Sequence, residues 1–237
     1  SNNLTINIEK TKTMIFNNSG RVLKERFIID NKYLELVQTF CYLGFDVKTS
    51  GAVSAATKKL YEKANSAMRP LMGVIAKFNI PVRKSIKLFH AYISPILLYA
   101  NEIWMPLTNK KLENFTNQTI FKDIEKNKMD LLHRQFLKYI MGTSKSCPNL
   151  AIYGDSGEMP LSLKAYRLML NYWLRVTKLP NKSLAKIALL ENVKLRTNWI
   201  ITIEKLVNCL KLTEVANDFN KFNRTIEKNI TTGFVKT

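Results

Sequence analysis

The stretch SGAVSAATKKLYEKANSAMRPLMGVIAKF, residues 50 to 78, decides the fold class of this chain. Its apolar residues recur at steps of three and four, which is the period of an α-helix with one buried face. These positions are Leu60, Ala64, Ala67, Met68, Leu71 and Ile75. Charged residues take the other faces, so we expect an amphipathic helix with a basic outer side, bent or interrupted at Pro70.

Short β-rich runs precede this helix and alternate with turn residues. In chain order they are KTMIF, RFIID, NKYLELV and FCYLGFDV. β-branched and aromatic residues between turn signals predict strands, and here we expect three or four antiparallel ones. The first 48 or so residues should therefore form a small antiparallel sheet.

Helical patterns fill the rest of the chain. The next helical stretch is VRKSIKLFHAYISPILLYANEIW, in which Pro95 marks a kink or a restart. Further helices are expected around residues 120 to 141, 161 to 178, 183 to 192 and 196 to 220. We therefore predict an α+β protein that is mostly α, with a β segment at 1–48, a helical part at 49–141 and a helical extension at 142–237.

The charge balance points to a polyanionic partner. The chain has 237 residues, of which 37 are Lys or Arg and 18 are Asp or Glu, so its formal charge is +19. Neutralising phosphates with release of counterions is the commonest use of such an excess, and nucleic acid is the first partner to consider. The alternative is that the lysines only solvate helix faces.

Cysteine and histidine give no sign of a metal site. Cys41, Cys147 and Cys209 are far apart and form no CxxC pair or Cys/His cluster, which excludes a zinc module and a disulfide scaffold. His90 and His133 are isolated in helical stretches, so we interpret both as packed or solvated histidines. We predict no metal site in this chain.

Two acids lie close to the start of a predicted helix. Asp155 and Glu158 precede Pro160, which is expected in the first turn of that helix. Acids are favoured near a helix N-terminus by the helix dipole, so capping is preferred here to an acid pair or a metal site.

No apolar run reaches the length of a membrane span, and no signal peptide opens the chain. We expect an intracellular protein, nuclear or cytoplasmic, that is not secreted and has no membrane partner.

An ordered set of motifs resembles a known family. The set is INIEKTKTMIF, FCYLGFDV, KKLYEKANSAMRPL, SIKLFHAYISPILLYANEIW, CPNLAIYGDSGEMPL and RLMLNYWLRV. It resembles the end of the palm, the thumb and the following helical segment of reverse transcriptases from LINE-like retrotransposons, which lack long terminal repeats. The resemblance covers roughly residues 3 to 178, with departures at Asn3, Ala100 and Asp155, where the family more often has Gly, Gly and Glu.

The resemblance implies a role for the lysines near the N-terminus. In the family a lysine at the end of the palm approaches the incoming triphosphate, where a cation stabilises charge on the departing pyrophosphate. Lys10 is the matching position and Lys12 the second choice. The alternative for either is a solvated lysine on a strand edge.

The resemblance also implies two nucleic-acid contacts. Tyr42, Leu43 and Gly44 match the hairpin at the junction of palm and thumb that holds the 3′ end of the primer; the alternative is a strand with Tyr42, Leu43 and Phe45 in the core. In the thumb helix, four basic residues are candidates to follow backbone phosphates, with a solvated helix face as the alternative. They are Lys58, Lys59, Lys63 and Arg69.

The metal-binding acids of the family are missing from this sequence. The palm holds two Mg²⁺ ions with carboxylates that include a Tyr-x-Asp-Asp turn, and no Asp-Asp pair occurs here. We therefore expect a C-terminal part of the polymerase that lacks the fingers and most of the palm, binds an RNA–DNA or DNA primer–template, and is inactive alone. Mg²⁺ is expected only for the full-length polymerase. Two alternatives remain, namely a domesticated basic nucleic-acid-binding module and a helical protein-interaction module.

Overall fold

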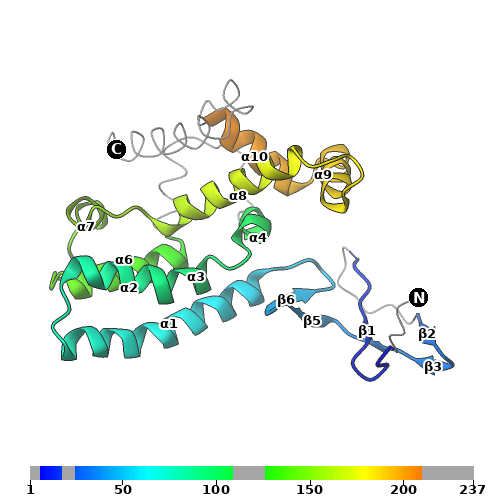
Figure 1. Ribbon diagram of the computed structural model, residues 1–237, viewed down its shortest axis with the longest axis horizontal. Helices are drawn as coiled ribbons and strands as arrows, with labels where there is room; N and C mark the ends of the chain where they lie inside the picture. Colours follow the sequence, from blue (N-terminus) through cyan, green and yellow to red (C-terminus); the bar gives the residue numbers. More distant parts are fainter. Residues whose placement is uncertain (1–5, 18–24, 109–125, 210–237) are drawn as a thin grey trace. The chain divides into compact units, whose positions relative to one another are not determined.

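The computed structural model describes residues 6–17, 25–108 and 126–209. The chain forms two compact units, Ser1–Lys59 and Leu60–Thr237. The division falls inside the first helix, α1 (Ser54–Lys77), and the strands that the structure describes all precede this helix (Figure 1).

The first unit contains three pairs of short strands. Two are antiparallel hairpins, β2 (Ile28–Ile29) with β3 (Lys32–Tyr33) and β5 (Thr39–Tyr42) with β6 (Phe45–Lys48). The third pair, β1 (Lys12–Thr13) with β4 (Glu35–Leu36), is parallel. The expectation of one antiparallel sheet therefore misses this pairing. The two hairpins need only a two-residue turn, whereas the stretch that joins β1 to β4 is long enough for a parallel connection.

Helix α1 buries the side that the sequence pattern predicts. Ala64, Met68 and Ile75 are buried, and Arg69 lies on the exposed side. The helix continues through Pro70, so the expected interruption is absent. Because Pro70 is exposed, solvent can satisfy the backbone carbonyl one turn earlier, which receives no hydrogen bond from the proline nitrogen.

The second unit is helical throughout its described part. Its remaining helices are α2 (Val82–Tyr92), α3 (Ser94–Leu97), α4 (Asn101–Thr108), α6 (Lys128–Ile140), α7 (Asn149–Ser156), α8 (Leu161–Thr177), α9 (Leu184–Lys194) and α10 (Asn198–Cys209). Helix α8 packs against α4, α6, α9 and α10 (Figure 1). The chain restarts near Pro95, at the start of α3, as predicted. The parts of the predicted helices at 120–125 and 210–220 lie outside the described residues.

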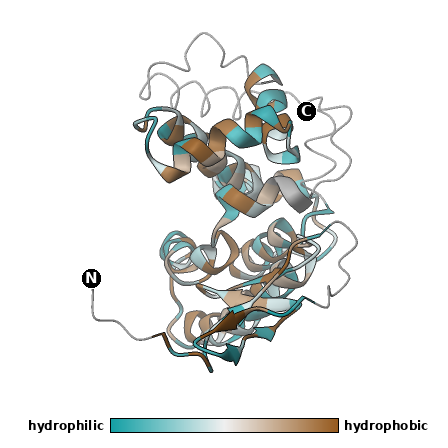
Figure 2. Cartoon of the chain, turned by 90° about the vertical axis from the view of Figure 1, so that its right-hand side faces the viewer, coloured by the Kyte–Doolittle hydropathy of each residue, from teal (hydrophilic) through white to brown (hydrophobic). Residues whose placement is uncertain are grey.

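The core of the second unit joins these helices. Bands of hydrophobic and hydrophilic residues alternate along individual helices, as expected of amphipathic elements (Figure 2). Phe89 on α2 packs against Phe136 on α6 with ring centroids 4.6 Å apart, and Met169, Leu170 and Ile203 are fully buried. The predicted fold class is confirmed, because the chain is mostly helical with small two-stranded sheets at its N-terminus.

No helix within the described residues is both long enough and apolar enough to span a membrane.

Candidate functional site

The predicted primer-contacting residues lie at the tip of the β5–β6 hairpin. Tyr42 and Phe45 form its last pair, and the turn residues Leu43 and Gly44 have φ of 49° and 81°. Positive φ at both positions is typical of the tight turns that match the twist of a hairpin. The side chains of Tyr42 and Leu43 are exposed, whereas Phe45 is half-buried. The alternative of a buried core is therefore wrong for Tyr42 and Leu43.

The predicted triphosphate lysine precedes its strand. Lys10 is exposed and lies in a turn, where its backbone N–H donates to Asn7 Oδ1 over 3.1 Å. Neither the predicted strand position nor the strand-edge alternative describes this residue. Lys12 is in β1 and forms an ion pair with Glu35 on the neighbouring strand β4. Lys10 is thus the more accessible of the two lysines.

The four basic candidates on α1 are all exposed, and Lys59 is paired with an acid of the strand before the helix. Lys59 Nζ lies 3.1 Å and 3.0 Å from the two carboxylate oxygens of Asp46, on β6. The hydrogen bond from Lys59 lowers the pKa of Asp46, so this pair is charged at neutral pH. The other three candidates are Lys58, Lys63 and Arg69.

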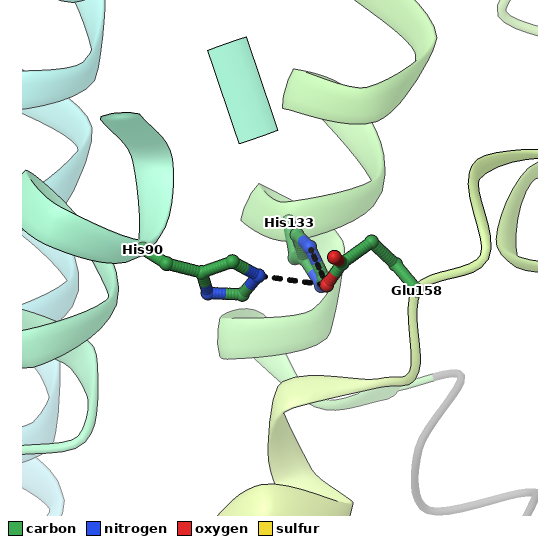
Figure 3. Close-up of side chains that lie close together, drawn as sticks. All are labelled: His90, His133 and Glu158. Carbon is green, nitrogen blue, oxygen red and sulfur yellow. Dashed lines mark hydrogen bonds and ion pairs between the residues drawn. The ribbon is translucent and has the colours of Figure 1, made fainter. Parts of the chain in front are cut away.

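A cluster that the sequence did not predict lies inside the second unit. His90 comes from α2, His133 from α6, and Glu158 from the loop between α7 and α8, and their side chains point toward one another (Figure 3). His90 Nε2 is 2.7 Å from Glu158 Oε2, and His133 Nε2 is 3.8 Å from the same oxygen. One ligand atom from each residue lies within 4.8 Å of the other two.

The imidazole of His133 is enclosed by aromatic rings. Its ring stacks on Phe89 with centroids 5.0 Å apart and an interplanar angle of 16°, and Tyr153 lies on another side. Burial lowers the pKa of His133 to about 3, so the ring is neutral. Within the part of the chain that the structure describes, neither of its ring nitrogens has a hydrogen-bond partner.

Two local features position Glu158. Gly157 ends α7 in the left-handed conformation with φ of 69°, and the Glu158 N–H donates to Tyr153 O over 3.1 Å. The start of α8 is tied to α6, because Asp130 Oδ1 accepts a hydrogen bond of 3.1 Å from the Ser162 N–H. The loop that carries Glu158 is therefore held from both sides next to His133.

The cluster corrects two sequence predictions. His90 and His133 are not isolated, because α2 and α6 bring them together in the fold. Glu158 does not cap α8, since its carboxylate contacts His90 and the N-cap residue of that helix is Pro160. No spacing rule could have found this cluster, because His90 and Glu158 are 68 residues apart.

Comparisons of the chain with family models, with curated proteins and with solved structures found no match.

Proposed function

We propose that this chain binds primer–template nucleic acid as the palm-end and thumb part of a LINE-like reverse transcriptase. The proposal rests on the ordered motifs, on the formal charge of +19 and on the exposed basic face of α1. In the proposed arrangement, α1 follows the phosphate backbone, the β5–β6 hairpin contacts the primer end, and Lys10 lies near the triphosphate.

The observation that carries the proposal is the composition of the exposed face of α1. Lys58, Lys63 and Arg69 are exposed, and the only acidic residue of the helix is Glu62. Phosphate contacts require cations that reach solvent, and they carry no sequence information. This face fits the non-specific part of primer–template binding.

Helix α2, the next helix along the chain, also carries exposed basic residues. Arg83, Lys84 and Lys87 are exposed, and α2 contains no acidic residue. Two successive helices therefore offer cations to a polyanion, while their apolar sides supply buried residues such as Met68 and Phe89.

The test is the salt dependence of binding to an RNA–DNA hybrid. Replacing Lys58, Lys63 and Arg69 with Gln removes three proposed phosphate contacts but leaves the ion pair of Lys59 with Asp46 intact. We expect weaker binding to hybrids of unrelated sequence. We also expect the slope of log affinity against log salt to flatten by roughly 0.7 to 0.9 per lost contact.

A matched control removes the same charge elsewhere. Lys145, Lys182 and Lys194 are exposed and lie outside α1 and α2, so their change to Gln should weaken binding less and flatten the slope less. Equal effects of the two sets would show that general charge attraction, and not the face of α1, determines binding.

The two alternative functions give different results. A protein-interaction module would be attracted to the hybrid only through its net charge, so the two sets of substitutions would then weaken binding equally. A domesticated nucleic-acid-binding module would show the salt dependence but would not prefer a duplex with a primer end to a blunt duplex. Changing Tyr42 to Ala separates this case, because we expect the change to weaken binding only when a primer end is present.

A further inference from the structure

We propose that His90, His133 and Glu158 form a binding site for a zinc-class divalent cation. The site uses none of the residues assigned to nucleic-acid binding, so the inference stands independently of the proposed function. Two imidazoles and one carboxylate are a ligand set that zinc takes in proteins, often with water in the fourth position.

The distances in the cluster suit a tetrahedral ion. Ligand atoms about 2.1 Å from a tetrahedral zinc ion lie about 3.4 Å from one another. The separation of His90 and Glu158 is 2.7 Å, that of His133 and Glu158 is 3.8 Å, and no pair exceeds 4.8 Å. Small rotations of the three side chains would bring all the ligand atoms to one ion.

His133 is the ligand that most needs a partner. Its side chain is 0% exposed, and within the described residues neither of its ring nitrogens accepts or donates a hydrogen bond. An unsatisfied buried polar atom is costly, and a metal ion bound at Nε2 would remove that cost for one of the two nitrogens. The ring is neutral, which is the state in which an imidazole donates its lone pair to a metal.

The surroundings supply both rigidity and access. Phe89 and Tyr153 fix the plane of the His133 ring, as the outer contacts of metal ligands usually do. The side chains of His90 and Glu158 are 26% and 20% exposed, so an ion can reach the site from solvent. Nitrogen ligands favour zinc and its neighbours over Mg²⁺, which prefers oxygen and keeps its water.

The test uses the full chain after treatment with a chelator. Zn²⁺ is added in a calorimetric titration, and Co²⁺ is added in parallel because its visible absorption reports the geometry of its ligands. We expect one ion per chain, visible absorption from bound Co²⁺, and a higher melting temperature with Zn²⁺ than without it.

Three single substitutions locate the site. His133→Phe keeps an aromatic ring against Phe89 but removes both nitrogens, and Glu158→Gln keeps a hydrogen-bond acceptor for His90 but removes the charge. We expect each change to weaken Zn²⁺ binding by at least about 10-fold. Asp155→Asn removes an exposed carboxylate three residues from Glu158 and should bind as the unmodified chain does.

The comparison among variants also tests whether the cysteines bind the zinc ion. The variants contain the same three cysteines, so binding by thiolates would persist in His133→Phe and in Glu158→Gln. Equal Zn²⁺ affinity in the unmodified chain and in Glu158→Gln would overturn the proposal, and the cluster would then be only a hydrogen-bonded histidine and carboxylate. If His133→Phe does not fold, as judged by circular dichroism, Glu158→Gln alone decides.

Discussion

Lys59 on α1 and Asp46 on β6 form an ion pair with a separation of 3.0 Å, so one of the four predicted phosphate-binding residues is engaged within the protein. The pair joins the start of α1 to the strand that follows the hairpin tip. One cation of the basic face is thus held by a carboxylate of the strand β6. The first prediction uses this ion pair.

Replacing Asp46 with Asn should strengthen binding to an RNA–DNA hybrid. The change releases Lys59 for phosphate contact and removes one negative charge near the duplex. We expect higher affinity and a slope of log affinity against log salt that is steeper by about one contact. Binding titrations at several salt concentrations measure both quantities.

The double variant with Lys59→Gln gives the control. If the release of Lys59 explains the gain, Asp46→Asn should add little affinity once Lys59 is absent. A gain of the same size in both backgrounds would show that only the removed negative charge matters.

Alanine substitutions at Gly44 and Gly73 should change the free energy of unfolding in opposite directions. Gly44 has φ of 81° in the hairpin turn, and an added Cβ would meet no atom within 4 Å, so only backbone strain opposes the change. We expect Gly44→Ala to reduce the free energy of unfolding by about 1 kcal/mol. Gly73 is exposed on α1, where alanine should raise the free energy of unfolding by about 0.5–1 kcal/mol.

Urea unfolding of the full chain measures both alanine variants, and amide exchange across residues 39–48 shows whether the loss at Gly44 is confined to the hairpin. A stable Gly44→Ala variant would contradict the assigned turn conformation.

Asp130 should make stability depend on pH in the mildly acidic range. Burial raises the pKa of Asp130 to about 6 from an ordinary value of 3.8. Between about pH 4 and pH 6, the folded state therefore holds a proton that the unfolded state has lost. The contribution of protonated Asp130 to the free energy of unfolding is complete below about pH 4 and is lost as the pH rises through 6. Relative to Asp130→Asn, the unmodified chain should lose about 2 kcal/mol of unfolding free energy between pH 4 and pH 7.

The Asn variant is a fair reference because its side-chain oxygen can still accept the hydrogen bond from the Ser162 N–H. Unfolding curves for both proteins at several pH values give the difference. A difference that stays constant from pH 4 to pH 7 would show that Asp130 does not hold a proton in the folded state.

The chain alone should not extend a primer in the presence of template, Mg²⁺ and nucleotides. Two-metal nucleotide transfer needs clustered carboxylates, and the sequence has no Asp-Asp pair. The His90, His133 and Glu158 cluster supplies a single carboxylate. A gel assay that resolves single additions checks this, with a competent polymerase added to show that the substrates work. Primer-extension activity that co-purifies with the chain would show that the chain contains an active site that we have not identified.

Local patterns predicted the local structure well. The period of apolar residues in 54–77 predicted α1 and its buried side, and the turn residues between the runs RFIID and NKYLELV predicted the β2–β3 hairpin. These features depend on neighbours in sequence, which side-chain periodicity and turn preferences describe directly.

The features that the sequence did not predict depend on packing between distant parts of the chain. The parallel pairing of β1 with β4 and the contact of Glu158 with His90 join residues that are far apart in the chain. A rule based on the helix dipole assigned Glu158 to capping, but the packing of α6 against α2 placed two imidazoles within its reach. No local signal distinguishes an acid that caps a helix from one that is drawn to a distant partner.

The hydrogen bond between His90 and Glu158 has a consequence for the order of folding. It closes a loop of 68 residues that contains α3, α4, α6 and α7, and loop closure becomes more costly with length. Contacts of this kind form after local helices, and this one needs α2 and the loop before α8 to have reached their places. This contact can therefore form only when α2 and the loop before α8 are packed together, and an ion bound there would be held only by chains that have reached this packing.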